Sequence, residues 1–268
     1  MSKKVNLGGQ IVYLTDFDAE TDKLSKDYGR TNLYSFGSVD LDNYMFGGYG
    51  RRNGYEIVVL FGDTGIGKST VALNMIAPAV VDGAKVGLLM LEDDGADVNA
   101  KLQRIMGKNV LGEHREQIHF TPQDVVDGEK LWGLEDLLVL IEKWFTQRKI
   151  DILVLDPIQF AFESAVSIKG ENEYISQRIF IRKINYLMRK LNKTIILVSH
   201  TAKNTQAKGM GRIIGSSGIA AGATKTIEIK KDKEGYLFLR LWKSRFTATP
   251  EHERVFSFDD NHKFSRQN

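Results

Sequence analysis

The segment Gly62–Thr70 reads Gly-Asp-Thr-Gly-Ile-Gly-Lys-Ser-Thr and contains the complete phosphate-binding pattern G-x-x-x-x-G-K-[ST]. An apolar run at Glu56–Phe61 precedes it, and a helical pattern at Thr70–Val81 follows it. This context matters because the loop binds phosphate where it joins a strand to the first turn of a helix. The motif therefore predicts a strand, a tight loop and a helix in this order, with a nucleotide bound at the loop.

The residues of this loop have separate expected roles. Glycines allow the backbone to turn tightly, so that several N–H groups can point at one phosphate chain. The Lys68 ammonium can reach the β- and γ-phosphates, and the Ser69 hydroxyl can ligate Mg²⁺. We therefore expect ATP and Mg²⁺ as cofactors. The predicted nucleotide-binding residues of the loop are Gly62, Asp63, Thr64, Gly65, Ile66, Gly67, Lys68, Ser69 and Thr70.

Composition excludes several classes of protein. The chain of 268 residues has no Cys, which rules out disulfides, Cys-ligated zinc and thiol catalysis. The N-terminus lacks the apolar run of a signal peptide, and no apolar stretch reaches transmembrane length. We therefore expect no membrane association and a cytoplasmic location, which is the host cytoplasm for a phage-encoded protein. The net charge of +3 is weak evidence for a nucleic-acid partner.

After residue 35, apolar runs alternate with helical patterns, as in βαβ units. The predicted fold is α/β, with a mostly parallel twisted sheet, helices on both faces and an antiparallel extension at the C-terminal end. Residues 1–35 are predicted to be an N-terminal arm or linker, and residues 36–268 one domain. The expected strands of the parallel part are Glu56–Phe61, Val86–Leu91, Ile118–Phe120, Ile150–Leu155 and Thr194–Val198. The expected strands of the extension are Thr224–Lys230, Tyr236–Trp242 and Arg254–Phe258.

Polar residues follow three of the predicted parallel strands, at the sheet edge where such folds bind ligands. Glu92 follows one strand and is the candidate to orient or deprotonate an attacking water. Asp156 ends another strand after four apolar residues, the Walker B pattern whose Asp holds the Mg²⁺ shell. His200 ends a third strand and is a candidate sensor of the γ-phosphate; a His that caps the strand through backbone hydrogen bonds is the alternative.

Two basic segments complete the predicted site. The glycine-rich segment 202–218 carries Lys203, Lys208 and Arg212, which are candidate DNA-binding residues beside the γ-phosphate. A surface loop without this function is the alternative. Lys243 and Arg245 lie two residues apart at the end of a predicted strand, so their side chains point the same way. They are candidates to contact a nucleotide bound by a neighbouring subunit.

Together these motifs resemble the RecA-like ATPase domain of ring-shaped replicative helicases of the DnaB type. The resemblance is strongest to the helicase half of phage primase–helicases and of the mitochondrial helicase twinkle. It runs from about Ser35 to the C-terminus. Beyond the phosphate loop, the matching segments are Phe36–Asp42, Gly87–Glu92, Leu155–Gln159, Val198–His200, Gly215–Gly218 and Lys243–Thr247.

The resemblance implies a RecA-like P-loop NTPase that assembles as a hexameric ring or a helical oligomer, with ATP at each subunit interface. One subunit would supply Lys68, Ser69, Glu92 and Asp156, and the next would supply Lys243 and Arg245. Single-stranded DNA would pass through the centre, and hydrolysis would drive translocation and strand separation during DNA replication. A primase or a helicase loader is an expected partner.

The chain departs from the family at two positions. The family has a Gln that couples DNA contact to the nucleotide, and the matching residue here is Gly222. The acid that often follows is replaced by Lys225. Two alternatives to a helicase therefore stay open. One is a RecA- or RadA-like recombination ATPase that forms filaments on DNA. The other is a non-motor accessory P-loop ATPase whose nucleotide state controls assembly with a partner.

Overall fold

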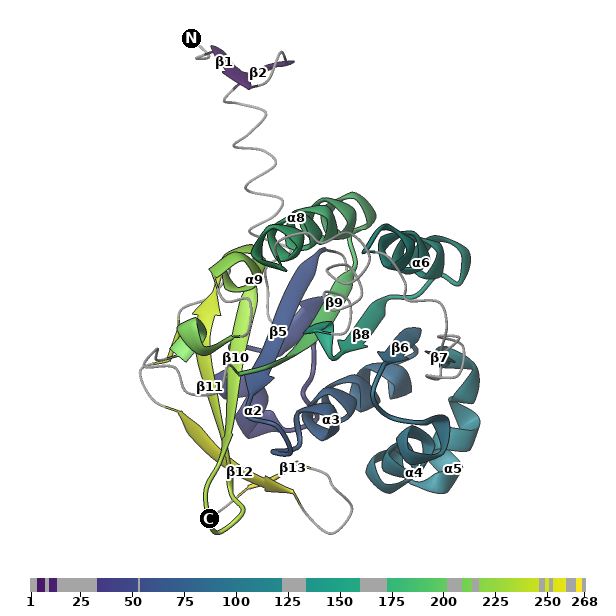
Figure 1. The fold of residues 1–268 in the computed structure, drawn as a ribbon. Helices are drawn as coiled ribbons and strands as arrows, with labels where there is room; N and C mark the ends of the chain where they lie inside the picture. The colour runs from purple at the N-terminus through teal and green to yellow at the C-terminus, as the bar shows by residue number, and fades with distance from the viewer. Residues whose placement is uncertain are drawn as a thin grey trace.

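The computed structural model describes residues 4–7, 10–13, 33–52, 54–121, 134–159, 173–201, 209–213, 217–245, 249–250, 253–258 and 264–266. Within this part of the chain, a nine-stranded sheet has the order β13-β12-β11-β10-β5-β9-β8-β6-β7 (Figure 1). Its strands are β5 (Glu56–Gly62), β6 (Val86–Met90), β7 (Ile118–Thr121), β8 (Ile152–Asp156), β9 (Thr194–His200), β10 (Lys225–Lys231), β11 (Leu237–Ser244), β12 (Arg254–Phe258) and β13 (Phe264–Arg266).

The six strands from β10 to β7 are parallel to one another. All residues of β5, β6 and β8 are buried, which explains their continuous apolar sequences, because helices cover both faces of a parallel sheet. From β10 to β13 every neighbouring pair is antiparallel. The predicted architecture is therefore confirmed. One detail differs, because the first strand of the predicted extension, β10, also pairs in parallel with β5.

Helices pack on the two faces of the sheet (Figure 1). Alternate residues of β5 point to opposite faces, so Val58 and Leu60 join one core cluster while Ile57, Val59 and Phe61 join the other. The first cluster includes residues of α2 (Val39–Tyr44), α3 (Lys68–Val81), α4 (Gly95–Met106) and α5 (Lys108–Glu113). The second includes residues of α6 (Leu134–Gln147), α8 (Glu173–Leu191) and α9 (Ser217–Gly222). Short 3₁₀ turns lie at η2 (Arg115–Gln117) and η4 (Gly209–Arg212).

Two small sheets lie outside the central one. β1 (Lys4–Leu7) pairs with β2 (Gln10–Tyr13), and β3 (Leu33–Tyr34) pairs with β4 (Tyr49–Arg51). The β3–β4 pair is part of the packed body, because the Tyr49 hydroxyl donates a 2.6 Å hydrogen bond to Met75 O in α3. The division at residue 35 stays a prediction.

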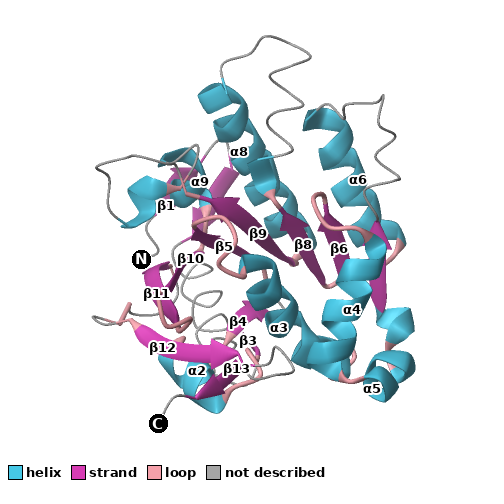
Figure 2. Ribbon diagram, turned by 60° about the horizontal axis from the view of Figure 1, so that its bottom comes forward, coloured by secondary structure: helices cyan, strands magenta, loops and turns pink. Residues whose placement is uncertain are grey.

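The described helices contain no segment that is both long and apolar enough to cross a membrane. Figure 2 shows how β5, β9, β8 and β6 lie side by side at the centre of the molecule, with α3 close to them. The carboxyl ends of these strands therefore meet at one edge of the sheet, where the phosphate loop leaves β5.

Candidate nucleotide-binding site

The phosphate loop connects β5 to α3 and requires its glycines for two reasons. A Cβ added to Gly62 would lie 2.3 Å from Ile229 O, so the close approach of β10 leaves no room for a side chain. Gly65 and Gly67 have φ values of 79° and 95°, which side chains rarely adopt. Gly67 is the N-cap of α3 and provides no side-chain cap, so the first N–H groups of the helix face the loop.

Lys68 is the first residue of α3 and is buried. Its Nζ donates a 2.8 Å hydrogen bond to Asp63 O, across the loop. Burial lowers the pKa of Lys68 below its ordinary value, while the carboxylates of Asp156, Glu92 and Asp63 oppose this shift. The ammonium is thus desolvated and surrounded by acids, a position in which a phosphate chain would satisfy it.

Asp156 ends β8, opposite Met90 in the register with β6, and is buried. Burial raises the pKa of Asp156 to about 6; a hydrogen bond from Ser69 opposes the shift. Among the described residues, Asp156 Oδ2 has no hydrogen-bond partner. A buried carboxylate oxygen without a partner, beside a hydroxyl, fits the few protein ligands of a Mg²⁺ ion that phosphates also coordinate. The described residues offer no cluster of three acidic or His ligands, so protein groups alone would not hold the ion.

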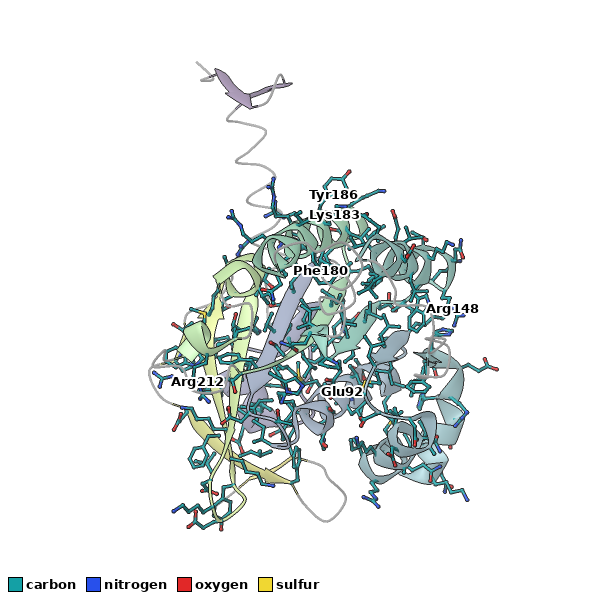
Figure 3. All side chains as sticks on the ribbon, in the orientation of Figure 1. Glu92, Arg148, Phe180, Lys183, Tyr186 and Arg212 are labelled. Atoms are coloured by element: carbon teal, nitrogen blue, oxygen red, sulfur yellow. The ribbon has the colours of Figure 1, made fainter. Side chains whose placement is uncertain are left out.

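The three acids after β6 have different surroundings, and this singles out Glu92. Asp93 accepts a 2.6 Å ion-pair contact from Lys101, and Asp94 caps α4 by accepting from Asp97 N at 2.8 Å. The Glu92 side chain is 61% exposed, and its Oε1 lies 3.7 Å from His200 Nε2. Figure 3 labels Glu92 near the carboxyl ends of the parallel strands. A carboxylate that has no other structural role at this place is suited to act on a water molecule.

His200 connects three of the strand ends. It lies opposite Gly62 in the register of β5 and β9, and its Nδ1 is 3.4 Å from Thr64 Oγ1 in the phosphate loop. Its backbone N–H donates to Gln159 Oε1 at 3.3 Å. Gln159 follows β8 and also donates to Ser199 Oγ at 2.8 Å. His200 therefore contacts the phosphate loop, Glu92 and a buried amide, and both predicted roles, sensing and capping, fit this position.

Of the three candidate DNA-binding residues, Lys203 and Lys208 lie outside the described residues. Arg212 ends η4 and forms ion pairs with Asp63 of the phosphate loop at 2.7 Å and with the buried Glu228 of β10 at 3.2 Å. The structure thus brings Arg212 to the nucleotide site. Sequence reasoning gave no partner for this residue.

Lys243 and Arg245 lie far from the phosphate loop of their own chain. Lys243 Nζ donates to Ala220 O and Ala221 O at 2.7 and 2.9 Å, and Arg245 donates to Ala221 O at 2.8 Å. Both side chains therefore bind the last carbonyls of α9. Burial lowers the pKa of Lys243 below its ordinary value, and the nearby charge of Arg245 adds to this shift.

The two departures from the family have structural explanations. A Cβ on Gly222 would lie 2.2 Å from Ile181 Cγ1, because α9 packs directly against α8. Lys225 is buried, donates a 2.6 Å hydrogen bond to Gly48 O and lies 3.9 Å from Glu56 Oε1. Neither position can present a polar side chain to a nucleotide or to DNA.

Two residues of the site were missed as functional candidates. Gln159 was recognised only as part of the Walker B segment, and that segment was the one available signal for it. Thr201, whose hydroxyl donates to Asp63 Oδ1, follows His200 directly and carried no signal in the sequence.

Comparison with known proteins agrees with this geometry. A family model described as an AAA domain matches residues 48–206. The ATPase domain of a DnaB-like phage helicase has 14% sequence identity and a TM-score of 0.70, with 95% of this chain and 98% of that chain covered. A KaiC-like protein, PH0186 from Pyrococcus horikoshii OT3, has 18% identity and a TM-score of 0.65, with 86% and 96% covered. No curated protein sequence matches the chain significantly.

The two solved structures confirm the predicted RecA-like fold. The family model covers more than half of the chain, including the phosphate loop, the Walker B strand and His200. The protein is therefore a P-loop ATPase that belongs to the AAA domain family.

Proposed function

We propose that the protein is an ATP-dependent DNA helicase motor that assembles as a ring or helical oligomer and moves along single-stranded DNA during DNA replication. The observation that carries this proposal is the position of Arg245. Its backbone N–H donates to Thr224 O, and Thr224 N–H donates to Ile57 O, so Arg245 lies beside the start of β5. The phosphate loop begins at the other end of that strand, after Gly62.

This separation supports a contact in trans. From residue 57 to residue 62 a parallel strand rises roughly 16 Å, and the loop extends beyond it. Arg245, which binds Ala221 O, cannot span this distance to its own nucleotide. It lies at the edge of a groove of about 460 Å³ that also contains Arg178, Arg182 and Arg189 of α8. Such a basic face suits the phosphates of a nucleotide held by a second copy.

The geometry suggests how the site's own residues would act on ATP. The N–H groups at the start of α3 and the Lys68 ammonium would bind the phosphates, and Ser69 and Asp156 would hold Mg²⁺. The ion would neutralise charge that develops between the β- and γ-phosphates. Glu92 would orient the attacking water and accept its proton. His200 would register loss of the γ-phosphate and transmit it through Gln159 and Ser199.

One alternative has specific support. Gly222 and Lys225 remove the side chains that couple DNA contact to hydrolysis in the family, and this favours a non-motor accessory ATPase. In that case ATP state would control assembly with a partner, and DNA would leave hydrolysis unchanged. A RecA- or RadA-like filament former is the remaining alternative, which strand exchange without directional unwinding would reveal.

The decisive experiment measures steady-state ATP hydrolysis with and without single-stranded DNA, followed by unwinding of a forked duplex. The proposal predicts that DNA stimulates hydrolysis and that the protein separates the fork. Lys68→Ala should abolish both activities, because it removes the cation that binds the β- and γ-phosphates. Normal unwinding by Lys68→Ala, or hydrolysis that DNA leaves unchanged in the unmodified protein, would contradict the helicase proposal.

The proposed partners are single-stranded DNA, further copies of the chain and a primase or helicase loader, with no membrane partner. The proposed location is the cytoplasm. Sizing of the protein with ATP and single-stranded DNA would test the oligomer, since a hexamer or helical polymer should form.

A further inference from the structure

Asp63 places a carboxylate inside the phosphate-binding loop. Its side chain is 63% exposed and directly follows Gly62. A bound triphosphate brings several negative charges to this loop, so an uncompensated carboxylate would oppose binding through repulsion. The loop can therefore use Asp63 only if another group offsets its charge.

Two residues close to the end of β9 bind this carboxylate. The Thr201 hydroxyl and Arg212 Nη2 both donate to Asp63 Oδ1, the latter at 2.7 Å. The Thr201 hydrogen bond lowers the pKa of Asp63 below its ordinary value, and Arg212 lowers it further through its charge and hydrogen bond. The main-chain oxygen of Asp63 accepts the hydrogen bond of the Lys68 ammonium. One residue thus links Arg212 to the lysine that binds phosphate.

The Arg212 guanidinium is itself fixed. Its Nη1 donates to Glu228 Oε1 at 3.2 Å, and the other oxygen of Glu228 accepts a 2.7 Å hydrogen bond from Trp242 Nε1. Glu228 is buried within β10, so Arg212 has a rigid anchor on the sheet. A bridge between Thr201 and Ile213 holds the adjoining backbone. Figure 3 labels Arg212 beside the strands of the antiparallel extension.

We propose that Arg212 is a positioning residue of the nucleotide site, which neutralises the Asp63 carboxylate and holds it against Thr201. The phosphate loop then presents Lys68 and its backbone N–H groups to ATP without a competing negative charge. This inference depends on the proposed binding of ATP at the loop. It assigns Arg212 to the nucleotide, whereas the sequence alone suggested DNA.

A charge-reversal logic tests the inference. Arg212→Ala should raise the Kd for MgATP about tenfold, because the carboxylate is left unbalanced at the phosphates. Asp63→Asn in the Arg212→Ala background should recover most of this loss, since it removes the charge that Arg212 offsets. Arg212→Lys should fall between the unmodified protein and Arg212→Ala. The measurement is calorimetric or fluorescent titration of the full chain with MgATP.

Two controls separate this role from others. Trp242→Phe removes a hydrogen bond to Glu228 without touching Asp63, and it should leave ATP affinity within about twofold of the unmodified protein. Circular dichroism and thermal unfolding would show that each variant is folded. Arg212→Ala that binds ATP normally, or a double variant as weak as the single one, would overturn the inference. So would a loss of affinity for single-stranded DNA without nucleotide, with ATP affinity unchanged.

Failure of the inference is distinguishable from failure of the proposed function. If the unmodified protein binds MgATP and the Arg212 variants behave as it does, only the role of Arg212 is wrong. If the unmodified protein does not bind MgATP, the nucleotide site itself is wrong, and the role of Arg212 falls with it.

Discussion

At the scale of single residues, the site depends on which acid after β6 keeps its carboxylate available. Asp93 is engaged by Lys101, and Asp94 is engaged by the first turn of α4. Glu92 faces His200, which in turn lies beside the phosphate loop. Electrostatic neighbours, and not the order of the three acids in the sequence, therefore distinguish the candidate general base.

We predict that Glu92→Gln lowers kcat for ATP hydrolysis at least 100-fold, because a positioned general base contributes about 10²- to 10⁴-fold. The Kd for MgATP should change little, since Gln keeps the size and polarity of the side chain. Asp93→Asn is the matched control and should retain most of the turnover. Loss of turnover in Asp93→Asn with retention in Glu92→Gln would reverse the assignment.

At the scale of elements, α9 explains why this chain lacks the family's coupling Gln. Gly218 and Gly222 lie four residues apart and face α8, where an added Cβ would lie 2.9 Å from Arg178 Cγ and 2.2 Å from Ile181 Cγ1. Asn185 Nδ2 also donates to Gly222 O at 2.8 Å. The small residues allow the two helices to approach closely, and α9 in turn offers the carbonyls that Lys243 and Arg245 bind.

We predict that Gly222→Ala lowers the free energy of unfolding by about 1–3 kcal/mol, because the new methyl group overpacks the α8–α9 contact. Gly112→Ala in α5 is the control, since an added Cβ there meets no atom within 4 Å. Ala at that helical position should be neutral or stabilising by up to about 1 kcal/mol. Urea unfolding at equilibrium measures both effects. Equal stability of Gly222→Ala and the unmodified protein would contradict the close packing.

The elements that the sequence predicted well are those with local signals. The apolar runs of β5 and β8, and the glycines before α3, identify strands and a helix start without reference to distant residues. The short helices α2 and α9 were not predicted, because six residues are too few to show helical periodicity. The parallel pairing of β10 with β5 is a contact between distant segments, which alternation within one strand does not reveal.

The same reasoning applies to the candidate site. The phosphate loop, Glu92, Asp156 and His200 were predicted because each follows an apolar run at a fixed edge of an α/β sheet. The partner of Arg212 was not, because Asp63 lies 149 residues away in the sequence. Long-range ion pairs have no local signature, and only the folded arrangement shows them.

At the scale of the whole molecule, the nucleotide site and Arg245 lie at opposite ends of β5. A single chain therefore contains both parts of the proposed catalytic centre but cannot bring them together. Two copies stacked head to tail could do so, and such an arrangement repeats into a ring or a helix. The fold thus makes hydrolysis a property of the assembly, if Arg245 acts on ATP.

We predict that mixing Arg245→Ala subunits with Lys68→Ala subunits restores part of the ATP hydrolysis that neither variant shows alone. In a mixed assembly, some interfaces pair the intact phosphate loop of an Arg245→Ala subunit with the intact Arg245 of a Lys68→Ala subunit. With random mixing at equal amounts, about one quarter of the interfaces would be intact in a ring or helix of head-to-tail contacts. Hydrolysis should therefore peak near equal amounts of the two variants. The matched control mixes Lys68→Ala with a Lys68→Ala/Arg245→Ala double variant, which contains no complete interface at any ratio. Absence of recovery at every ratio, in mixtures shown to form joint oligomers, would mean that Arg245 does not serve a neighbouring nucleotide.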